Sequence, residues 1–274
     1  MPELPEVETI VIGLKNMVVN NIIKDVIIKE TGLIAFPDPD TFKKALKGKK
    51  IRAIKRRGKY IIFNISDQKN LIIHLRMTGR LLVKPSNLEY NKHTHIIFKL
   101  DDAMDLRFNN VRKFGRLYLV EKGEYKEAGG LADLGPEPLA QKFTFKKFKE
   151  LFINRSKNIK ALLLDQTFLA GLGNIYTDEA LFSAGINPMR TADSLNNNEK
   201  KKLYKAIKKV LKIGIKYGGT SFSDYVNASG EKGEFQDKLK VYQKEGHRCP
   251  ECGSEIVKTR IAGRGTHYCP QCQK

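Results

Sequence analysis

The four cysteines constrain this 274-residue chain most strongly, because all of them fall within its last 26 residues as Cys249-x2-Cys252 and Cys269-x2-Cys272. Sixteen residues separate the two pairs, a spacing typical of a tetrahedral zinc site with four thiolate ligands. Four thiolates leave no coordination position for a substrate, so we expect one structural zinc ion. Such a short segment cannot build a sizeable core, and the metal should supply most of its folding free energy.

The charge of the chain predicts a polyanionic partner. Fifty Lys+Arg against 30 Asp+Glu give a formal net charge of +20, and the basic residues are spread along the whole chain. This distribution favours nucleic acid over an anionic membrane, which would require a basic amphipathic helix or tail. The sequence has no apolar run of about 18 residues and no basic N-terminal signal region, so we expect no membrane partner, a cytoplasmic location and no disulfides.

Arg264 stands between two glycines in the stretch that separates the cysteine pairs. Glycine lets a backbone approach a ligand closely. Two interpretations stay open from the local sequence. Arg264 is either an exposed residue of an ordinary hairpin turn or the fingertip of a zinc module that binds a DNA phosphate.

The periodicity of apolar residues changes along the chain. Residues 5–18 have helical spacing, and Pro5 suits a first helical turn. Short alternating runs follow between 22 and 121 and predict an antiparallel sandwich or barrel; they cover 25–29, 59–65, 71–75, 95–100 and 116–120. After a Pro/Gly-rich linker at 129–138, residues 143–217 have helical patterns, and 218–237 form a long loop.

Pro2 and Glu3 immediately precede the first predicted helix. Removal of Met1 would expose Pro2 as a secondary amine with a pKa well below that of lysine, and the helix dipole would lower this pKa further. Such an amine can form a Schiff base with a sugar carbon, and Glu3 could transfer the protons. A purely structural alternative stays open, in which Pro2 takes no part in a reaction and Glu3 only favours the start of the helix.

The N-terminal string Met1-Pro-Glu-Leu-Pro-Glu-Val-Glu-Thr9 resembles the bacterial formamidopyrimidine-DNA glycosylase family, and the resemblance covers essentially the whole chain. Further matching stretches follow in the same order: Arg57-Gly58-Lys59-Tyr60, His74-Leu-Arg-Met77, His93-Thr-His95, Val111-Arg-Lys-Phe114-Gly115, Asp133-Leu-Gly-Pro-Glu-Pro138, Asp165-Gln166, Ala170-Gly171-Leu-Gly-Asn174-Ile-Tyr176 and the cysteine segment with Arg264.

The resemblance implies an α+β multidomain protein. Residues 1–131 should form a catalytic domain, with an N-terminal helix and an antiparallel β-sandwich. A helix–two-turn–helix DNA-binding domain should span 132–225, with a lesion-recognition loop at about 218–237. The four-cysteine zinc finger should span 240–274. The implied partner is damaged double-stranded DNA, bound by a monomer associated with the nucleoid.

The implied activity is that of a bifunctional DNA glycosylase and AP lyase of base-excision repair. It would excise oxidised purines, namely 8-oxoguanine opposite cytosine and formamidopyrimidines, and cleave the strand by β,δ-elimination. Pro2 would form the Schiff base, Glu3 would transfer protons, and Lys59 and Arg264 would complete the catalytic set. Lys59 has an alternative interpretation as a lysine of a hairpin turn.

The remaining implied residues bind DNA. Met77, Arg112 and Phe114 match the residues that fill the space left by a flipped base, although Met77 and Phe114 alone would more often be core residues. Phosphate contacts are expected from His74, His93, Arg155, Asn174 and Tyr242, together with Lys59 and Arg264. Base contacts are expected in the loop from Ser221, Ser223, Asp224 and Tyr225.

Two alternatives remain. An endonuclease VIII-like glycosylase for oxidised pyrimidines shares Pro2, Glu3 and the zinc finger, but its members usually begin Pro-Glu-Gly-Pro, whereas this chain has Leu4. A non-catalytic zinc-ribbon protein that binds nucleic acid explains the charge and the cysteines. It gives no reason for Pro2 and Glu3.

Overall fold

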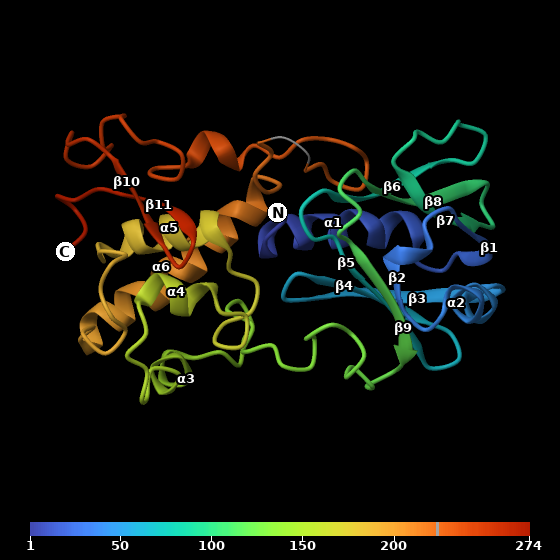
Figure 1. The fold of residues 1–274 in the computed structure, drawn as a ribbon, viewed down its shortest axis with the longest axis horizontal. Helices are drawn as coiled ribbons and strands as arrows, with labels where there is room; N and C mark the ends of the chain where they lie inside the picture. The colour runs from blue at the N-terminus through green and yellow to red at the C-terminus, as the bar shows by residue number, and fades with distance from the viewer. Residues whose placement is uncertain (223–224) are drawn as a thin grey trace. The chain divides into compact units, whose positions relative to one another are not determined.

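The computed structural model describes residues 1–222 and 225–274. The chain forms two compact units, drawn as a ribbon in Figure 1. Unit 1 comprises Met1–Asp133 and Tyr217–Glu234, and unit 2 comprises Leu134–Lys216 and Phe235–Lys274. A segment from the second half of the chain therefore belongs to the same unit as the N-terminus.

Unit 1 combines helices with a nine-stranded sheet, in agreement with the predicted α+β class. Its elements are α1 (Leu4–Val18), β1 (Ile22–Ile28), η1 (Thr31–Leu33), β2 (Ile34–Phe36), α2 (Pro39–Leu46), β3 (Lys49–Arg57), β4 (Tyr60–Ile65), β5 (Lys69–His74), β6 (Gly79–Pro85), β7 (Thr94–Leu100), β8 (Met104–Asn110) and β9 (Arg116–Glu121). The first helix and the five strand runs predicted from periodicity are all present, with shifted ends.

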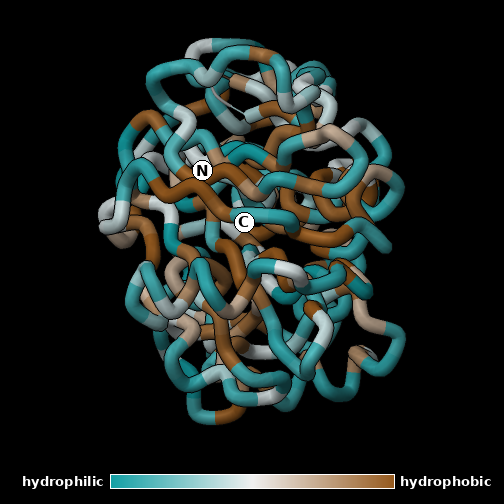
Figure 2. The backbone as a smooth tube through the Cα atoms, turned by 90° about the vertical axis from the view of Figure 1, so that its right-hand side faces the viewer, coloured by the Kyte–Doolittle hydropathy of each residue, from teal (hydrophilic) through white to brown (hydrophobic). Residues whose placement is uncertain are grey.

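The sheet has the order β2-β9-β5-β4-β3-β1-β7-β8-β6. In the described residues, the part β2-β9-β5-β4-β3 joins the part β1-β7-β8-β6 where Ile22 and Ile23 of β1 pair with Lys50 and Lys49 of β3. All strand pairs are antiparallel except β2–β9, which is parallel. Alternate residues of both parts enter one apolar core with α1, and Figure 2 shows the hydrophobic stretches mainly toward the inside.

Helix α2 was not predicted from the sequence, which indicated only strands between 22 and 121. Asp38 caps its N-terminus by accepting a hydrogen bond from the Thr41 N–H at 2.9 Å, and Pro39 occupies the first turn. The helix has only eight residues, and its buried side chains Phe42 and Leu46 are too few to establish a helical period.

Unit 2 contains the predicted helices and a two-stranded hairpin. Its elements are α3 (Phe145–Glu150), α4 (Ile159–Leu164), α5 (Asn174–Ala184), α6 (Asn197–Lys216), η2 (Phe235–Lys238), β10 (Val257–Ile261) and β11 (Arg264–Tyr268). The apolar face predicted for the last helix is buried along α6. On that face, a Cβ atom at Gly214 would lie 2.5 Å from the ring of Tyr176, so the glycine is required for the close packing of α5 and α6.

Among the residues that the structure describes, none of the helices combines the length and the apolar composition needed to span a membrane.

Candidate functional site

Pro2 lies directly before the N-terminus of α1, which begins at Leu4 after the capping residue Glu3. Glu3 and Glu6 form a reciprocal capping box, and the Glu3 N–H donates to Oε2 of Glu6 at 2.8 Å. Both carboxylic side chains are buried. The chain therefore holds Pro2 at the positive end of a helix, an environment that favours the neutral amine once Met1 has been removed.

Met77, Arg112 and Phe114 lie together on the surface of unit 1. The Arg112 guanidinium has Nη1 3.4 Å from Sδ of Met77 and Cζ 5.0 Å from the centroid of the Phe114 ring. Met77 is 43% exposed and Phe114 is 49% exposed, so neither residue belongs to the core. The structure thus brings the three sequence-predicted residues into one exposed cluster, as wedge residues require.

An open hollow adjoins this cluster and is lined by Met1, Arg76, Met77, Phe114 and Arg116. It combines two cationic side chains with apolar ones, a mixture suited to a nucleotide, which has anionic and aromatic parts. Because Met1 lines the hollow, the N-terminus and the exposed cluster belong to one site within unit 1.

A series of side-chain and backbone hydrogen bonds connects the backbone of Arg112 to that of His93. Thr78 Oγ1 accepts from the Arg112 N–H at 3.0 Å and donates to Oδ1 of Asn110 at 2.9 Å. The Asn110 N–H in turn donates to the carbonyl of His93 at 2.9 Å. His93 is half-buried at the residue before β7, next to the segment that carries Arg112.

Lys59 and His74 lie at one end of strands β4 and β5. Lys59 occupies the two-residue turn between β3 and β4, as its hairpin interpretation predicted, yet its side chain is only 6% exposed. Nδ1 of His74 accepts from the Arg76 N–H at 3.0 Å. Burial, with smaller contributions from the charges of Arg76 and Lys59, lowers the pKa of His74 to about 3. His74 is therefore neutral, with its proton on Nε2.

Two of the loop residues expected to contact a damaged base, Ser221 and Tyr225, form contacts within unit 1. Tyr225 is buried in the core of unit 1, and its hydroxyl donates to the carbonyl of Gly218 at 2.9 Å. Burial and the nearby Glu6 raise the pKa of this phenol. Ser221 Oγ donates to the carbonyl of Tyr225 and accepts from the Gly233 N–H, both at 2.9 Å. In this structure both side chains stabilise the loop itself.

Ser223 and Asp224, the other two expected base contacts, lie outside the described residues. The predicted loop is also shorter than expected at its C-terminal end, because η2 begins at Phe235.

In unit 2, Asn174 contacts the hairpin residue that follows Arg264. Asn174 is the first residue of α5, and its Nδ2 donates to the carbonyl of Gly265 at 2.8 Å. Arg264 is exposed and pairs with Ile261 across the β10–β11 turn. Both interpretations of Arg264 remain open. It is a residue of a hairpin, as the first requires, and that hairpin is anchored beside the N-terminus of a helix, a favourable position for binding phosphate, as the second requires.

Arg155 is exposed in the segment between α3 and α4, and Tyr242 is half-buried in the segment after η2. Three consecutive backbone N–H groups at residues 240–242 donate to the buried carboxylate of Glu179, including that of Tyr242 at 2.9 Å. Burial raises the pKa of Glu179, while these hydrogen bonds oppose the shift. Glu179 thus fixes the backbone that carries Tyr242.

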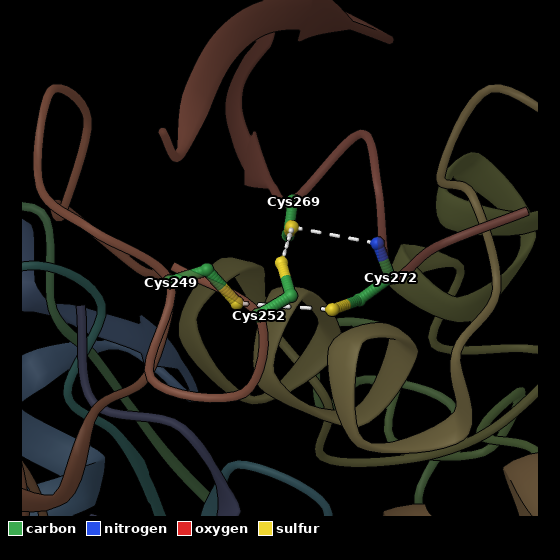
Figure 3. A group of neighbouring side chains, drawn as sticks. All are labelled: Cys249, Cys252, Cys269 and Cys272. Atoms are coloured by element: carbon green, nitrogen blue, oxygen red, sulfur yellow. Dashed lines mark hydrogen bonds between the residues drawn. The ribbon is translucent and has the colours of Figure 1, made fainter. Parts of the chain in front are cut away.

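The four cysteines come from two segments, Cys249–Cys252 and Cys269–Cys272, and their side chains point toward one another, as Figure 3 shows. All four sulfur atoms lie within 4.8 Å of one another. Sγ of Cys252 lies 3.5 Å from that of Cys269, and Sγ of Cys249 lies 3.8 Å from that of Cys272. Four sulfurs around one zinc at about 2.3 Å would be separated by about 3.8 Å, so the donor set fits a single structural zinc ion.

Three family models match the chain in succession. The formamidopyrimidine-DNA glycosylase N-terminal domain matches residues 1–117, and the H2TH domain of the same glycosylase matches residues 134–226. A zinc finger found in FPG and IleRS matches residues 246–274. This chain belongs to the formamidopyrimidine-DNA glycosylase family.

Full-length relatives of the family agree with this assignment. The chain is 48% identical to the formamidopyrimidine-DNA glycosylase of Heliobacterium modesticaldum, with all of both chains covered. It is 47% identical to the enzyme of the same name from Enterococcus faecalis, covering 100% of this chain and 98% of the relative. These names favour the formamidopyrimidine-DNA glycosylase branch over the endonuclease VIII-like alternative.

Solved structures of formamidopyrimidine-DNA glycosylases share the fold. A Lactococcus lactis FPG mutant in complex with Fapy-dG-containing DNA has a TM-score of 0.93 at 39% identity, and both chains are covered completely. MutM (FPG) from Thermus thermophilus has a TM-score of 0.90 at 39% identity, covering 99% of this chain and 98% of that one.

Unit 2 also contains a buried ion pair that was not predicted from the sequence. Lys160 Nζ lies 2.7 Å from Oδ1 of Asp178 and donates to the carbonyl of Gly265 at 3.0 Å. Oδ2 of Asp178 accepts from the His267 N–H at 2.9 Å. These contacts anchor the hairpin that carries Arg264. The local signal was the presence of charged residues in two short, largely apolar helices, Lys160 in α4 and Asp178 in α5.

Proposed function

We propose that this chain is a bifunctional DNA glycosylase and AP lyase that excises oxidised purines during base-excision repair. The match to formamidopyrimidine-DNA glycosylases over the whole chain supports the glycosylase reaction. The observation that carries the proposal for this chain is the exposed cluster of Met77, Arg112 and Phe114 beside the hollow at the N-terminus. A zinc-ribbon binder without catalytic activity would not require this arrangement.

The nucleophile in this proposal is the amine of Pro2, freed by removal of Met1. Its nitrogen forms a bond with C1′ of the damaged nucleotide while the C1′–base bond breaks, and the leaving base takes up a proton. The amine then loses its proton, the C1′–O4′ bond breaks as O4′ takes up a proton, and an iminium ion forms. Glu3 lies next to this nitrogen in the chain, is buried, and is the candidate to transfer these protons.

Strand cleavage follows because the iminium accepts electrons. Loss of a proton from C2′ allows the 3′ C–O bond to break, and a second elimination breaks the 5′ C–O bond. The expected product is a one-nucleotide gap with phosphate at both ends. Lys59 and neutral His74 are the candidates to hold a phosphate near the reacting sugar, with Lys59 supplying charge and Nε2 of His74 a hydrogen bond.

DNA recognition requires the damaged nucleotide to leave the base stack. Met77 and Phe114 would fill the space that remains, and Arg112 would donate hydrogen bonds to the orphaned partner base. In unit 2, Arg264 and Asn174 would bind phosphate on the hairpin that zinc stabilises, with further contacts from Arg155, His93 and Tyr242. Ser223 and Asp224 remain candidates for base contacts.

The partner in this proposal is damaged double-stranded DNA, and the net charge of +20 favours it. We also propose that the protein acts as a monomer in the cytoplasm, associated with the nucleoid, and that residues 1–131, 132–225 and 240–274 are its catalytic, DNA-binding and zinc-finger domains.

The direct test uses duplexes with 8-oxoguanine opposite each of the four bases and, for comparison, a duplex with an oxidised pyrimidine. The purified protein should release the oxidised base, cleave the strand to a gap with two phosphate ends, and form a borohydride-stable adduct. Preference for an oxidised pyrimidine would favour the endonuclease VIII-like alternative. Binding without release or an adduct would favour the zinc-ribbon binder.

A further inference from the structure

One buried carboxylate connects the N-terminus of α1 to the loop that begins after α6. Oε2 of Glu6 accepts from the Glu3 N–H at 2.8 Å, and Oε1 accepts from the Thr220 N–H, also at 2.8 Å. Glu6 is 2% exposed and Thr220 is 5% exposed, so both hydrogen bonds are shielded from water. The two donors are 217 residues apart in the sequence.

We propose that Glu6 is a positioning residue that couples docking of the 218–222 segment to placement of Pro2 for attack on the sugar. The inference rests on the proposed function, because it assumes Pro2 as the nucleophile. It adds a role for the loop that does not depend on a base in the site. A docked loop fixes one oxygen of the carboxylate, and the other oxygen then fixes the backbone next to Pro2.

The loop side of this connection is closely packed. Gly219 has φ +82°, and a Cβ atom there would lie 2.8 Å from Cγ of Glu6. The Tyr225 hydroxyl, which donates a hydrogen bond to the carbonyl of Gly218, also lies 3.3 Å from the carbonyl oxygen of Glu6. The loop therefore touches both the side chain and the backbone of Glu6, which makes it unable to move away without disturbing the first turn of α1.

On the N-terminal side, the covalent path from the Glu6 hydrogen bond to Pro2 is short. Pro2 is separated from the Glu6 hydrogen bond only by the Pro2–Glu3 peptide group, whose N–H is the donor. A change in the position of the carboxylate therefore acts on a planar unit that is bonded directly to Pro2. Attack on C1′ requires the nitrogen within about 3–3.5 Å of the carbon in the correct direction, so a small displacement is enough to slow the reaction.

The test uses duplex DNA with a preformed abasic site, which contains no damaged base for the loop to recognise. The measured quantity is the single-turnover rate of borohydride trapping at saturating enzyme. Thr220→Pro removes the donor on the loop side and leaves the Glu3 side intact. We expect it to lower the trapping rate about ten-fold, the loss expected for one hydrogen bond to a charged acceptor.

Two further variants keep the test decisive if proline disturbs folding. Gly219→Ala should slow trapping in the same way, because its Cβ would displace Glu6. Glu6→Gln should also slow trapping, since an amide NH2 cannot accept from a backbone N–H. The matched control is Glu231→Gln, the same substitution made in the loop that carries Thr220; the Glu231 carboxylate accepts from Asn227 Nδ2 at 2.9 Å. It should trap at the wild-type rate.

The inference is overturned if folded, DNA-saturated Thr220→Pro and Gly219→Ala proteins trap the abasic site at the wild-type rate, even if they excise 8-oxoguanine slowly. The loop would then serve base recognition alone. If the wild-type protein itself forms no adduct, the proposed function fails, and this outcome is distinct because no variant is involved.

Discussion

The guanidinium of Arg112 lies over the ring of Phe114, with 5.0 Å between Cζ and the ring centroid. The backbone N–H of the same arginine donates a hydrogen bond to Oγ1 of the buried Thr78. Contacts of both its side chain and its backbone therefore hold this exposed cation in a defined position. A group that must recognise an orphaned base benefits from such an arrangement, because less conformational entropy is lost on binding.

The first prediction concerns the opposite base. Cytosine offers O2 and N3 as acceptors to Arg112, whereas adenine offers N1 beside a donating amino group. A good bidentate contact contributes about 1–3 kcal/mol of discrimination, so excision of 8-oxoguanine opposite cytosine should exceed that opposite adenine by about one to two orders of magnitude. Arg112→Ala should narrow this ratio, as measured by single-turnover excision.

The control for Arg112→Ala is its activity on a preformed abasic site, which should persist because Pro2 is intact. A full preference for cytosine in the variant would mean that Arg112 only packs or binds phosphate. Phe114→Ala would then be the next variant to measure.

The second prediction concerns Pro2. Borohydride should trap the protein on lesion DNA through residue 2 after removal of Met1, and peptide mass spectrometry should locate the adduct there. Pro2→Leu should abolish trapping, because a large second residue retains the initiator methionine and no secondary amine is exposed. An adduct on Lys59 or another lysine of the wild-type protein would contradict the assignment.

The third prediction concerns zinc. Cys249→Ser removes one of four thiolates, so the protein should lose its zinc ion and the β10–β11 hairpin should become disordered. DNA affinity should then fall because Arg264 is no longer fixed. Zinc content by mass spectrometry and affinity for a lesion duplex check both steps. Arg264→Ala is the matched control, since it should weaken binding while zinc is retained. Full affinity in zinc-free protein would contradict the prediction.

The parts of the site that the sequence predicted depend on local signals. The cysteine ligands follow from spacing within each pair, and the first helix and α6 follow from apolar periodicity over many residues. The cluster of Met77, Arg112 and Phe114 was available only through family motifs, because nothing local distinguishes an exposed Met or Phe from a core residue. Its contact between Arg112 and Met77 joins residues 35 apart in the sequence.

The contacts that sequence analysis missed join distant residues. Lys160 Nζ donates a hydrogen bond to Thr266, which is 106 residues away in the sequence. The Thr220 N–H donates to Glu6, which is 214 residues away. No periodicity or spacing rule pairs such positions. The burial of Tyr225 was not predictable for a related reason, since a tyrosine in a polar loop gives no sign that the loop folds back into the core of unit 1.

The fourth prediction concerns pH. Burial lowers the pKa of His74 to about 3, whereas in the unfolded chain it should be near 6.5. Between these values the unfolded chain binds a proton that the folded protein does not, so stability falls as pH decreases from about 6.5 toward 3. The slope from this one group approaches about 1.4 kcal/mol per pH unit. Urea unfolding of wild type and His74→Gln at pH 6 and pH 4.5 measures the difference; the variant should have the shallower dependence, and equal slopes would contradict the prediction.

The last prediction concerns salt. If about four to six phosphates are neutralised by the basic residues, counterion release should give a slope of log K against log salt concentration near −4 to −5. Each phosphate contact contributes about −0.9 to this slope, so Arg264→Ala should make it less steep by about one unit. Lys244→Ala is the matched control, a lysine for which we infer no phosphate contact. Fluorescence anisotropy with one duplex at several salt concentrations measures all three slopes. An affinity that stays nearly constant from low to moderate salt would mean that the basic residues do not face DNA. An unchanged slope in Arg264→Ala would instead favour the interpretation of Arg264 as an ordinary hairpin residue.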